Sequence, residues 1–158
     1  MDENWLKQAP EGQGQFAAIA RRALEAFRAD AQEAYAQLVK EYDNSSAVIG
    51  VFGMGSVTLA VRGGEAAIHE QAPDKPGRLV GRGAAYPETI LALSEGRVTP
   101  VEAFHSGDLV VRAASEELHR AFGLMVKYSE SAVRSERLQD VLKEFRALAQ
   151  AADCSRSS

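Results

Sequence analysis

The spacing of the apolar residues changes from a helical to a strand period close to residue 46, and no other feature limits the possible folds as strongly. Between Phe16 and Tyr42, apolar residues recur at steps of three and four, which predicts one long amphipathic helix. From Ala47 to Ala85 they come in short runs bounded by turn residues, which predicts strands at 47–52, 56–62, 65–70 and 78–85. A Gly-Gly pair between the second and third runs predicts a tight hairpin.

The second half of the chain combines short helices, one strand and longer helices. Two short helices are predicted between residues 87 and 107, bounded by Pro87, Gly96, a Thr99–Glu102 capping box and Gly107. Residues 108–112 predict a fifth strand, and two further helices follow, of which the last reaches about Ala152. This order predicts an α+β fold with a five-stranded, mainly antiparallel sheet covered by helices, and with an extra C-terminal helix.

More apolar helix faces are predicted than the two faces of one small sheet can bury. This surplus favours an apolar pocket that adaptable side chains such as Met125 partly fill. The 158 residues suffice for one domain with its own core. We expect a flexible leader at 1–15 and a main domain at 16–130. We expect a C-terminal helix and polar tail at 131–158 to pack on that same domain.

Composition excludes several classes of protein. The net charge is -4 and basic residues form no stripe, which argues against nucleic-acid binding. No run of 18 apolar residues occurs, so we expect no segment integral to a membrane. The single cysteine, Cys154, cannot form an internal disulfide, which favours a cytoplasmic location.

Motifs for catalysis, metals and cofactors are weak. The run "GVFGMGS" lacks the lysine of a phosphate-binding loop, and the three histidines have no metal-ligand spacing, so we expect neither a metal nor a cofactor. His105, Ser106 and Asp108 lie on one short segment, whereas members of a catalytic triad come from separate elements. We expect no catalytic residue, and His105 is the one titratable candidate for acid–base chemistry.

The segment "ETILALSEGRVTPVEAFHSGDLVVR", residues 88–112, resembles the signature region of the sterol carrier protein type 2 (SCP2) family of lipid-binding domains. The matching positions are Leu91, Leu93, Gly96, Arg97, Pro100, Ala103, Phe104, Gly107, Leu109 and Val111. The order of elements over about residues 16–128 fits the same family. The resemblance implies a five-stranded sheet with helices over one face and an apolar tunnel between them.

The resemblance also implies non-covalent carriage of a lipid or another hydrophobic small molecule. We place the binding site on Leu91, Phe104, Leu109, Val111, Leu118, Phe122 and Met125. One alternative is an enzyme or accessory protein that acts on an apolar biosynthetic intermediate, such as a polyketide- or terpenoid-like compound. Another is an interaction module whose C-terminal helices form a homodimer or bind a partner protein.

Overall fold

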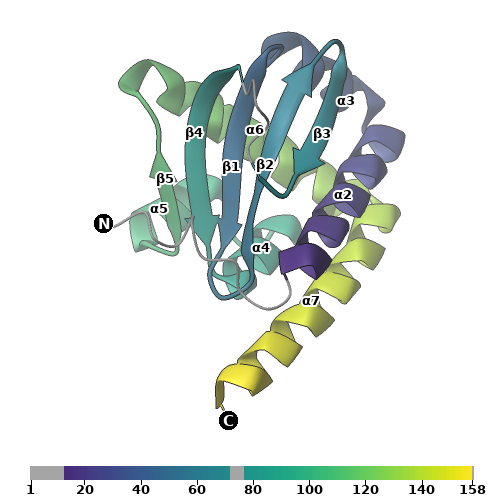
Figure 1. Ribbon diagram of the computed structural model, residues 1–158, viewed down its shortest axis with the longest axis vertical. Helices are drawn as coiled ribbons and strands as arrows, with labels where there is room; N and C mark the ends of the chain where they lie inside the picture. The colour runs from purple at the N-terminus through teal and green to yellow at the C-terminus, as the bar shows by residue number, and fades with distance from the viewer. Residues whose placement is uncertain (1–12, 72–76, 158) are drawn as a thin grey trace.

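The structure is a computed structural model that describes residues 13–71 and 77–157. The described helices are α2 (Gln13–Asp30), α3 (Gln32–Glu41), α4 (Pro87–Ser94), α5 (Pro100–Ser106), α6 (Ser115–Arg134) and α7 (Glu136–Ser157). The described strands are β1 (Ser45–Val51), β2 (Gly55–Arg62), β3 (Glu65–His69), β4 (Arg78–Ala85) and β5 (Leu109–Arg112). Figure 1 shows α2, α4, α6 and α7 on one face of the sheet.

The five strands form one sheet in the order β3-β2-β1-β4-β5. Every neighbouring pair is antiparallel except β1 and β4, which run parallel at the centre. The predicted hairpin joins β2 to β3, and both of its glycines adopt positive φ, 62° at Gly63 and 82° at Gly64, as a tight hairpin turn requires. The predicted α+β class with a mainly antiparallel five-stranded sheet is therefore confirmed.

The single long helix predicted for residues 16–42 is wrong, because the chain forms two helices separated at Ala31. Ala31 has φ -129° and ψ 58°, which is not helical. The preceding carboxylate of Asp30 accepts a hydrogen bond of 2.6 Å from Ser135 Oγ and pairs with Arg137 at 3.4 Å. These contacts tie the break to the start of α7. The apolar stripe continues across it, since Phe27 and Tyr35 are both buried, so periodicity alone shows no break.

The turns around α4 and α5 have the predicted chemistry. The Glu102 amide donates to Thr99 Oγ1, and the Thr99 amide donates to Glu102 Oε1, each at 3.2 Å, which completes the capping box. Gly107 ends α5 in the left-handed region with φ 85°. Helix α5 is thereby fixed at both ends, and it packs against β5.

The ends of the chain differ in detail from the predicted boundaries. Helix α2 begins at Gln13, and residues 1–12 of the expected leader lie outside the described residues, as do residues 72–76 of the expected polar loop. Helix α6 runs to Arg134, so the expected boundary at residue 130 falls inside it, and α7 starts after the single residue Ser135. The backbone at Cys154 is helical, and its side chain is outside the described part of the structure. Within the described residues, no helix is long and apolar enough to cross a membrane.

The main core lies between the helices and the sheet. One buried cluster joins Phe16 of α2, Val57 of β2 and Phe145 of α7. A second joins Phe27, Tyr35 and Leu138, of which Leu138 is completely buried. Helices α2 and α7 lie side by side although they are far apart in sequence (Figure 1), and Arg22 pairs with Glu144 across them at 2.8 Å.

Candidate binding cavity

A cavity of about 270 Å³ lies between the sheet and the helices that cover it. Its wall contains residues from α2, α4, α6 and α7 and from all five strands. Almost all of the lining side chains are apolar, and typical members are Phe27, Ile49, Leu59, Ile90, Val141 and Phe145. The space therefore suits an apolar occupant, because it offers few hydrogen-bonding partners to water.

The sheet forms the floor of the cavity, and β4 leaves room there because it has glycines where the neighbouring strands have side chains. In the register, Gly83 lies between Ile49 of β1 and Val111 of β5, and alternation places all three on the same face of the sheet. All three residues line the cavity. A Cβ atom added to Gly83 would meet, among the described atoms within 4 Å, only the Val110 carbonyl oxygen at 3.7 Å. A side chain added at Gly83 would therefore begin with one ordinary van der Waals contact and extend on the face of the sheet that lines the cavity.

Three polar side chains belong to the described lining residues: Arg82, Lys127 and Tyr128. Arg82 pairs in register with Val48 and Arg112, so strand alternation directs its side chain to the face opposite Gly83. Lys127 forms an ion pair of 3.0 Å with Glu41. In the described part of the chain, no three His, Cys, Asp or Glu side chains group as metal ligands would. The arrangement provides an apolar enclosure with Lys127 as a basic group in its wall.

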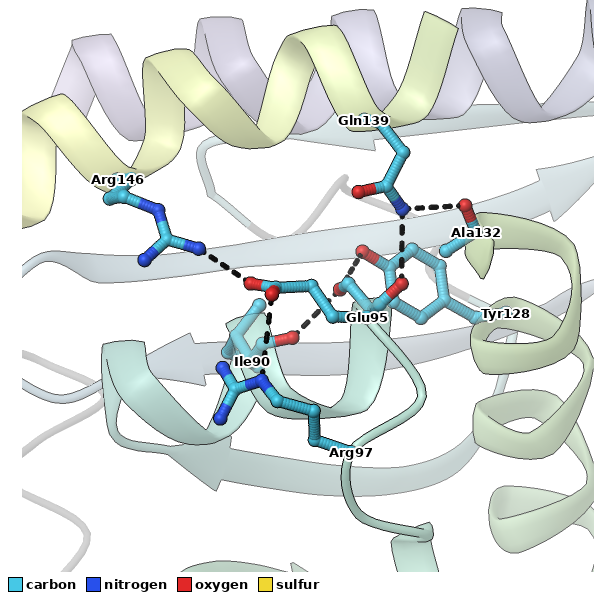
Figure 2. Close-up of polar contacts among 8 residues, drawn as sticks. Ile90, Glu95, Arg97, Tyr128, Ala132, Gln139 and Arg146 are labelled. Atoms are coloured by element: carbon cyan, nitrogen blue, oxygen red, sulfur yellow. Dashed lines mark hydrogen bonds and ion pairs between the residues drawn. The ribbon is translucent and has the colours of Figure 1, made fainter. Parts of the chain in front are cut away.

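Tyr128 joins the wall of the cavity to a polar network between α4, α6 and α7 (Figure 2). Its hydroxyl lies 2.7 Å from Ser94 Oγ, and Ser94 Oγ donates to the Ile90 carbonyl at 2.7 Å. Gln139 Nε2 donates to the carbonyls of Ser94 and Ala132, at 3.2 and 2.8 Å. Burial raises the pKa of Tyr128, and the hydrogen bond to Ser94 opposes that rise. Tyr128 is therefore a neutral structural link between the helices.

Replacing Tyr128 with phenylalanine is expected to lower the free energy of unfolding by about 1 kcal/mol at neutral pH, because one buried hydrogen bond is lost. A raised pKa in the folded state stabilises the protein below the unfolded pKa of about 10, and this contribution is lost as pH rises further. The stability difference between wild type and Tyr128→Phe should therefore shrink above pH 10. Urea unfolding at pH 7 and 10.5 measures it, with Tyr86→Phe, at a half-exposed tyrosine, as control. A difference that is independent of pH would contradict this expectation.

The seven residues predicted to bind ligand divide into two groups in the structure. Leu109, Val111 and Met125 line the cavity. Leu91 is buried in the core beside Phe16 and Val51, outside the lining. Phe104, Leu118 and Phe122 also lie outside it, and the Phe104 and Phe122 rings meet edge to face at 5.3 Å. Ligand contact by any of the seven stays a prediction.

For the residues on α6, the division follows from the geometry of the helix. Ala121, Leu124, Met125 and Tyr128 form the stripe that lines the cavity. Phe122 is turned toward α5, where it contacts Phe104. Periodicity groups the apolar residues of this helix into one face, whereas the folded helix has two apolar neighbours.

Three parts of the wall were not predicted from the sequence: the α2 stripe, the α7 stripe that includes Phe145, and the glycine floor. The available signal for the floor was the run "GRGAA" in β4, where small residues replace the bulky residues expected in a buried strand. Such a run indicates space above the strand or close approach of another group.

His105 lies exposed near the end of α5 and outside the lining of the cavity. Its ring contacts Phe104, with 5.9 Å between the ring centroids. The Ser106 hydroxyl lies 2.9 Å from Asp108 Oδ2 and 3.0 Å from the Ala103 carbonyl oxygen, and its one hydrogen is donated to these acceptors, so its described hydrogen bonds do not involve His105. The three neighbouring polar residues therefore lack the linear relay of a catalytic triad.

Replacing Phe122 with alanine is expected to cost about 1–3 kcal/mol of stability, less than the ~3–5 kcal/mol of a fully packed ring, because Phe122 is half-buried. Ligand affinity should not change, since the ring does not line the cavity. The matched variant Phe145→Ala removes a buried ring that lines it, so both stability and affinity should fall. Urea unfolding and fluorescent-ligand titration separate the two effects. Loss of affinity in Phe122→Ala alone would move the binding site toward α5.

A mainly antiparallel five-stranded sheet with helices over one face and an apolar cavity between them defines a particular class of α+β domain. Comparison with solved structures names that class. The solved structure of "UbiJ-SCP2 Ubiquinone synthesis protein" is similar over 78% of this chain and 97% of that chain, with a TM-score of 0.53 and 17% identity. The chain therefore has an SCP2-like fold, as the resemblance of residues 88–112 predicted.

A second similar structure is sterol carrier protein 2 from Yarrowia lipolytica in its apo form. It is 12% identical over 77% of this chain and 96% of that chain, with a TM-score of 0.47. No family model matches the sequence, and no curated protein matches it significantly.

Proposed function

We propose that the protein binds a lipid or another hydrophobic small molecule, without covalent chemistry, in the cavity between the sheet and the helices. The observation that carries this proposal is the apolar lining of a space of about 270 Å³ above Gly83. The SCP2-like fold supports it, because the family that residues 88–112 resemble consists of lipid-binding domains. Binding would be driven by removing the apolar surface of the ligand from water.

The size of the cavity limits which ligands the protein can hold in this structure. An apolar cavity of about 150 Å³ binds benzene, so by simple proportion 270 Å³ accommodates roughly ten to twelve carbon atoms. A ligand that buries on the order of 200 Å² of apolar surface gains about 5 kcal/mol before the costs of association. We propose a compact or single-chain ligand, and a larger one would require the helices to move outward.

A chain-length series tests the proposal. Linear alcohols of increasing length would be titrated against the full chain by displacement of an environment-sensitive fluorescent fatty acid, and native mass spectrometry would identify the bound species. Each added methylene should improve affinity by up to about 0.8 kcal/mol until the cavity is full, near ten to twelve carbons. Sterols and ubiquinone belong in the same panel. Absence of saturable binding and of any bound mass across the panel would refute the proposal.

A carrier or accessory protein for an apolar biosynthetic intermediate is one form of this function. The similar UbiJ-SCP2 protein carries ubiquinone synthesis in its name. For an enzyme, the candidate group His105 is exposed and lies outside the cavity wall, so the geometry favours binding over catalysis. A measurable turnover of an apolar substrate that is lost in His105→Phe would reverse this preference.

The proposed interaction module draws no support from α7, because its apolar stripe packs on α2 and lines the cavity of its own chain. A homodimer through the C-terminal helices therefore stays a secondary prediction, which sedimentation of the full chain would test. A cytoplasmic location also stays a prediction, and it rests on the single cysteine.

A further inference from the structure

Lys127 is the basic side chain at the rim of the cavity. It follows Leu124 by three residues on α6 and precedes Tyr128, and all three residues line the cavity. The Lys127 side chain is 24% exposed, and its ammonium lies 3.0 Å from the Glu41 carboxylate at the end of α3. Lysine commonly packs its aliphatic stem on apolar surface and keeps its charge in water. Lys127 therefore borders the apolar space while its charge is held outside by Glu41.

Arg120, another basic residue of α6, is already held by several contacts within the protein. Arg120 donates to Glu117 Oε2 at 3.1 Å and to the Glu41 carbonyl at 2.6 Å, and its guanidinium lies 4.8 Å from the Tyr42 ring centroid. Glu117 is buried and also pairs with Arg78. Breaking this network would leave the buried Glu117 carboxylate without its cationic partners, which costs folding free energy. The Lys127–Glu41 pair has a different character, because the Glu41 side chain is 53% exposed and is readily solvated if it separates.

We infer that Lys127 binds the polar head group of a ligand whose chain lies in the cavity. Glu41 of the same chain competes with that head group for the Lys127 ammonium. An amphiphile with a carboxylate head would place its chain in the cavity and take over the Lys127 ammonium from Glu41. A neutral amphiphile would enter the same space and leave the Lys127–Glu41 pair intact. The pair thus sets the preference between acidic and neutral ligands. This inference rests on the proposed function, because it assumes that the cavity takes an apolar chain.

The exchange is energetically accessible. A partly exposed ion pair typically contributes less than a factor of about five to an equilibrium, so a ligand carboxylate can compete with Glu41. The ammonium has three donors on a flexible four-carbon stem, which allows it to turn from Glu41 to a head group at the rim. The two carboxylates would repel each other at one ammonium, so Glu41 opposes acid binding more than alcohol binding.

The test compares decanoate with 1-decanol, which have equal carbon number, at pH 8 and low salt, in full-length variants. Glu41→Gln should raise decanoate affinity by up to about fivefold, and Lys127→Gln should lower it by a similar factor. Decanol affinity should change by less than about twofold in both variants. The matched controls are Lys143→Gln and Asp140→Asn, which break an exposed Lys–Asp pair of 3.4 Å on α7, outside the cavity wall. These controls should alter neither ligand.

The outcomes separate this inference from the proposed function. If wild type binds decanol but both rim variants leave the decanoate-to-decanol ratio unchanged, the assignment of Lys127 and Glu41 is wrong and the carrier function stands. If the Lys143→Gln control shifts that ratio as much as Lys127→Gln does, the effect is general electrostatics and the assignment again fails. If wild type binds neither probe, both the assignment and the proposed function are overturned. Circular dichroism and thermal unfolding would verify that each variant is folded.

Discussion

Gly83→Phe is expected to abolish binding of a ten-carbon ligand while leaving the protein folded. A Cβ at this position makes only an ordinary contact, and Gly83 lacks positive φ, so the substitution introduces no backbone strain. The added ring would occupy more than half of the 270 Å³ cavity, given that about 150 Å³ holds benzene. A ten-carbon ligand would lose room for about five of its carbons, which at ~0.8 kcal/mol each corresponds to a roughly 1,000-fold loss of affinity.

The stability of Gly83→Phe should be unchanged or slightly higher, because an aromatic residue suits a strand interior better than glycine. Ala67→Phe is the matched control: it adds the same ring at an exposed position of β3, outside the cavity wall. Fluorescent-ligand displacement and urea unfolding measure the two properties. A folded Gly83→Phe protein that binds decanol as wild type does would show that ligands bind elsewhere.

Leu138→Ala is expected to lower the free energy of unfolding by about 3–5 kcal/mol, the largest effect on stability that we predict. The Leu138 side chain is 0% exposed and joins α7 to the cluster that contains Phe27, Tyr35 and Ala132. Its loss removes buried apolar surface and enlarges the existing cavity. Val133→Ala, at a position 50% exposed on α6, should change stability by less than about 0.5 kcal/mol.

Urea unfolding followed by circular dichroism tests this difference, with the slope of free energy against urea serving as a check on two-state behaviour. Equal effects of Leu138→Ala and Val133→Ala would mean that α7 contributes little to the folded state.

The sequence predicted the elements well where local chemistry determines them. The Thr99–Glu102 capping box and the glycine stop at Gly107 are local features, and the structure has them as expected. The hairpin at Gly63-Gly64 is equally local. The α+β class followed from the order of helices and strands, and the resemblance of residues 88–112 led to the SCP2-like fold.

The cavity wall was less predictable because it depends on relations between distant elements. Gly83 becomes a floor only because β4 pairs with both β1 and β5, and the parallel β1–β4 pairing is not encoded in either strand alone. Phe122 has the spacing of a core residue, yet its neighbour is Phe104 of α5. The break at Ala31 lies next to a hydrogen bond between Asp30 and Ser135, which is 105 residues away in sequence.

The pairing of α2 with α7 has a consequence for synthesis. Arg22 and Glu144 are 122 positions apart, so α2 leaves the ribosome long before the helix that covers it. Until Phe145 has been made, the apolar side chains of Phe16 and Ile19 lack part of their cluster, and the cavity lacks a wall. Contacts of such long sequence separation slow folding and expose nascent chains to wrong associations. We therefore expect closure of the cavity to be a late event in the life of each new chain, and chaperones that shield apolar surface to matter most during that interval.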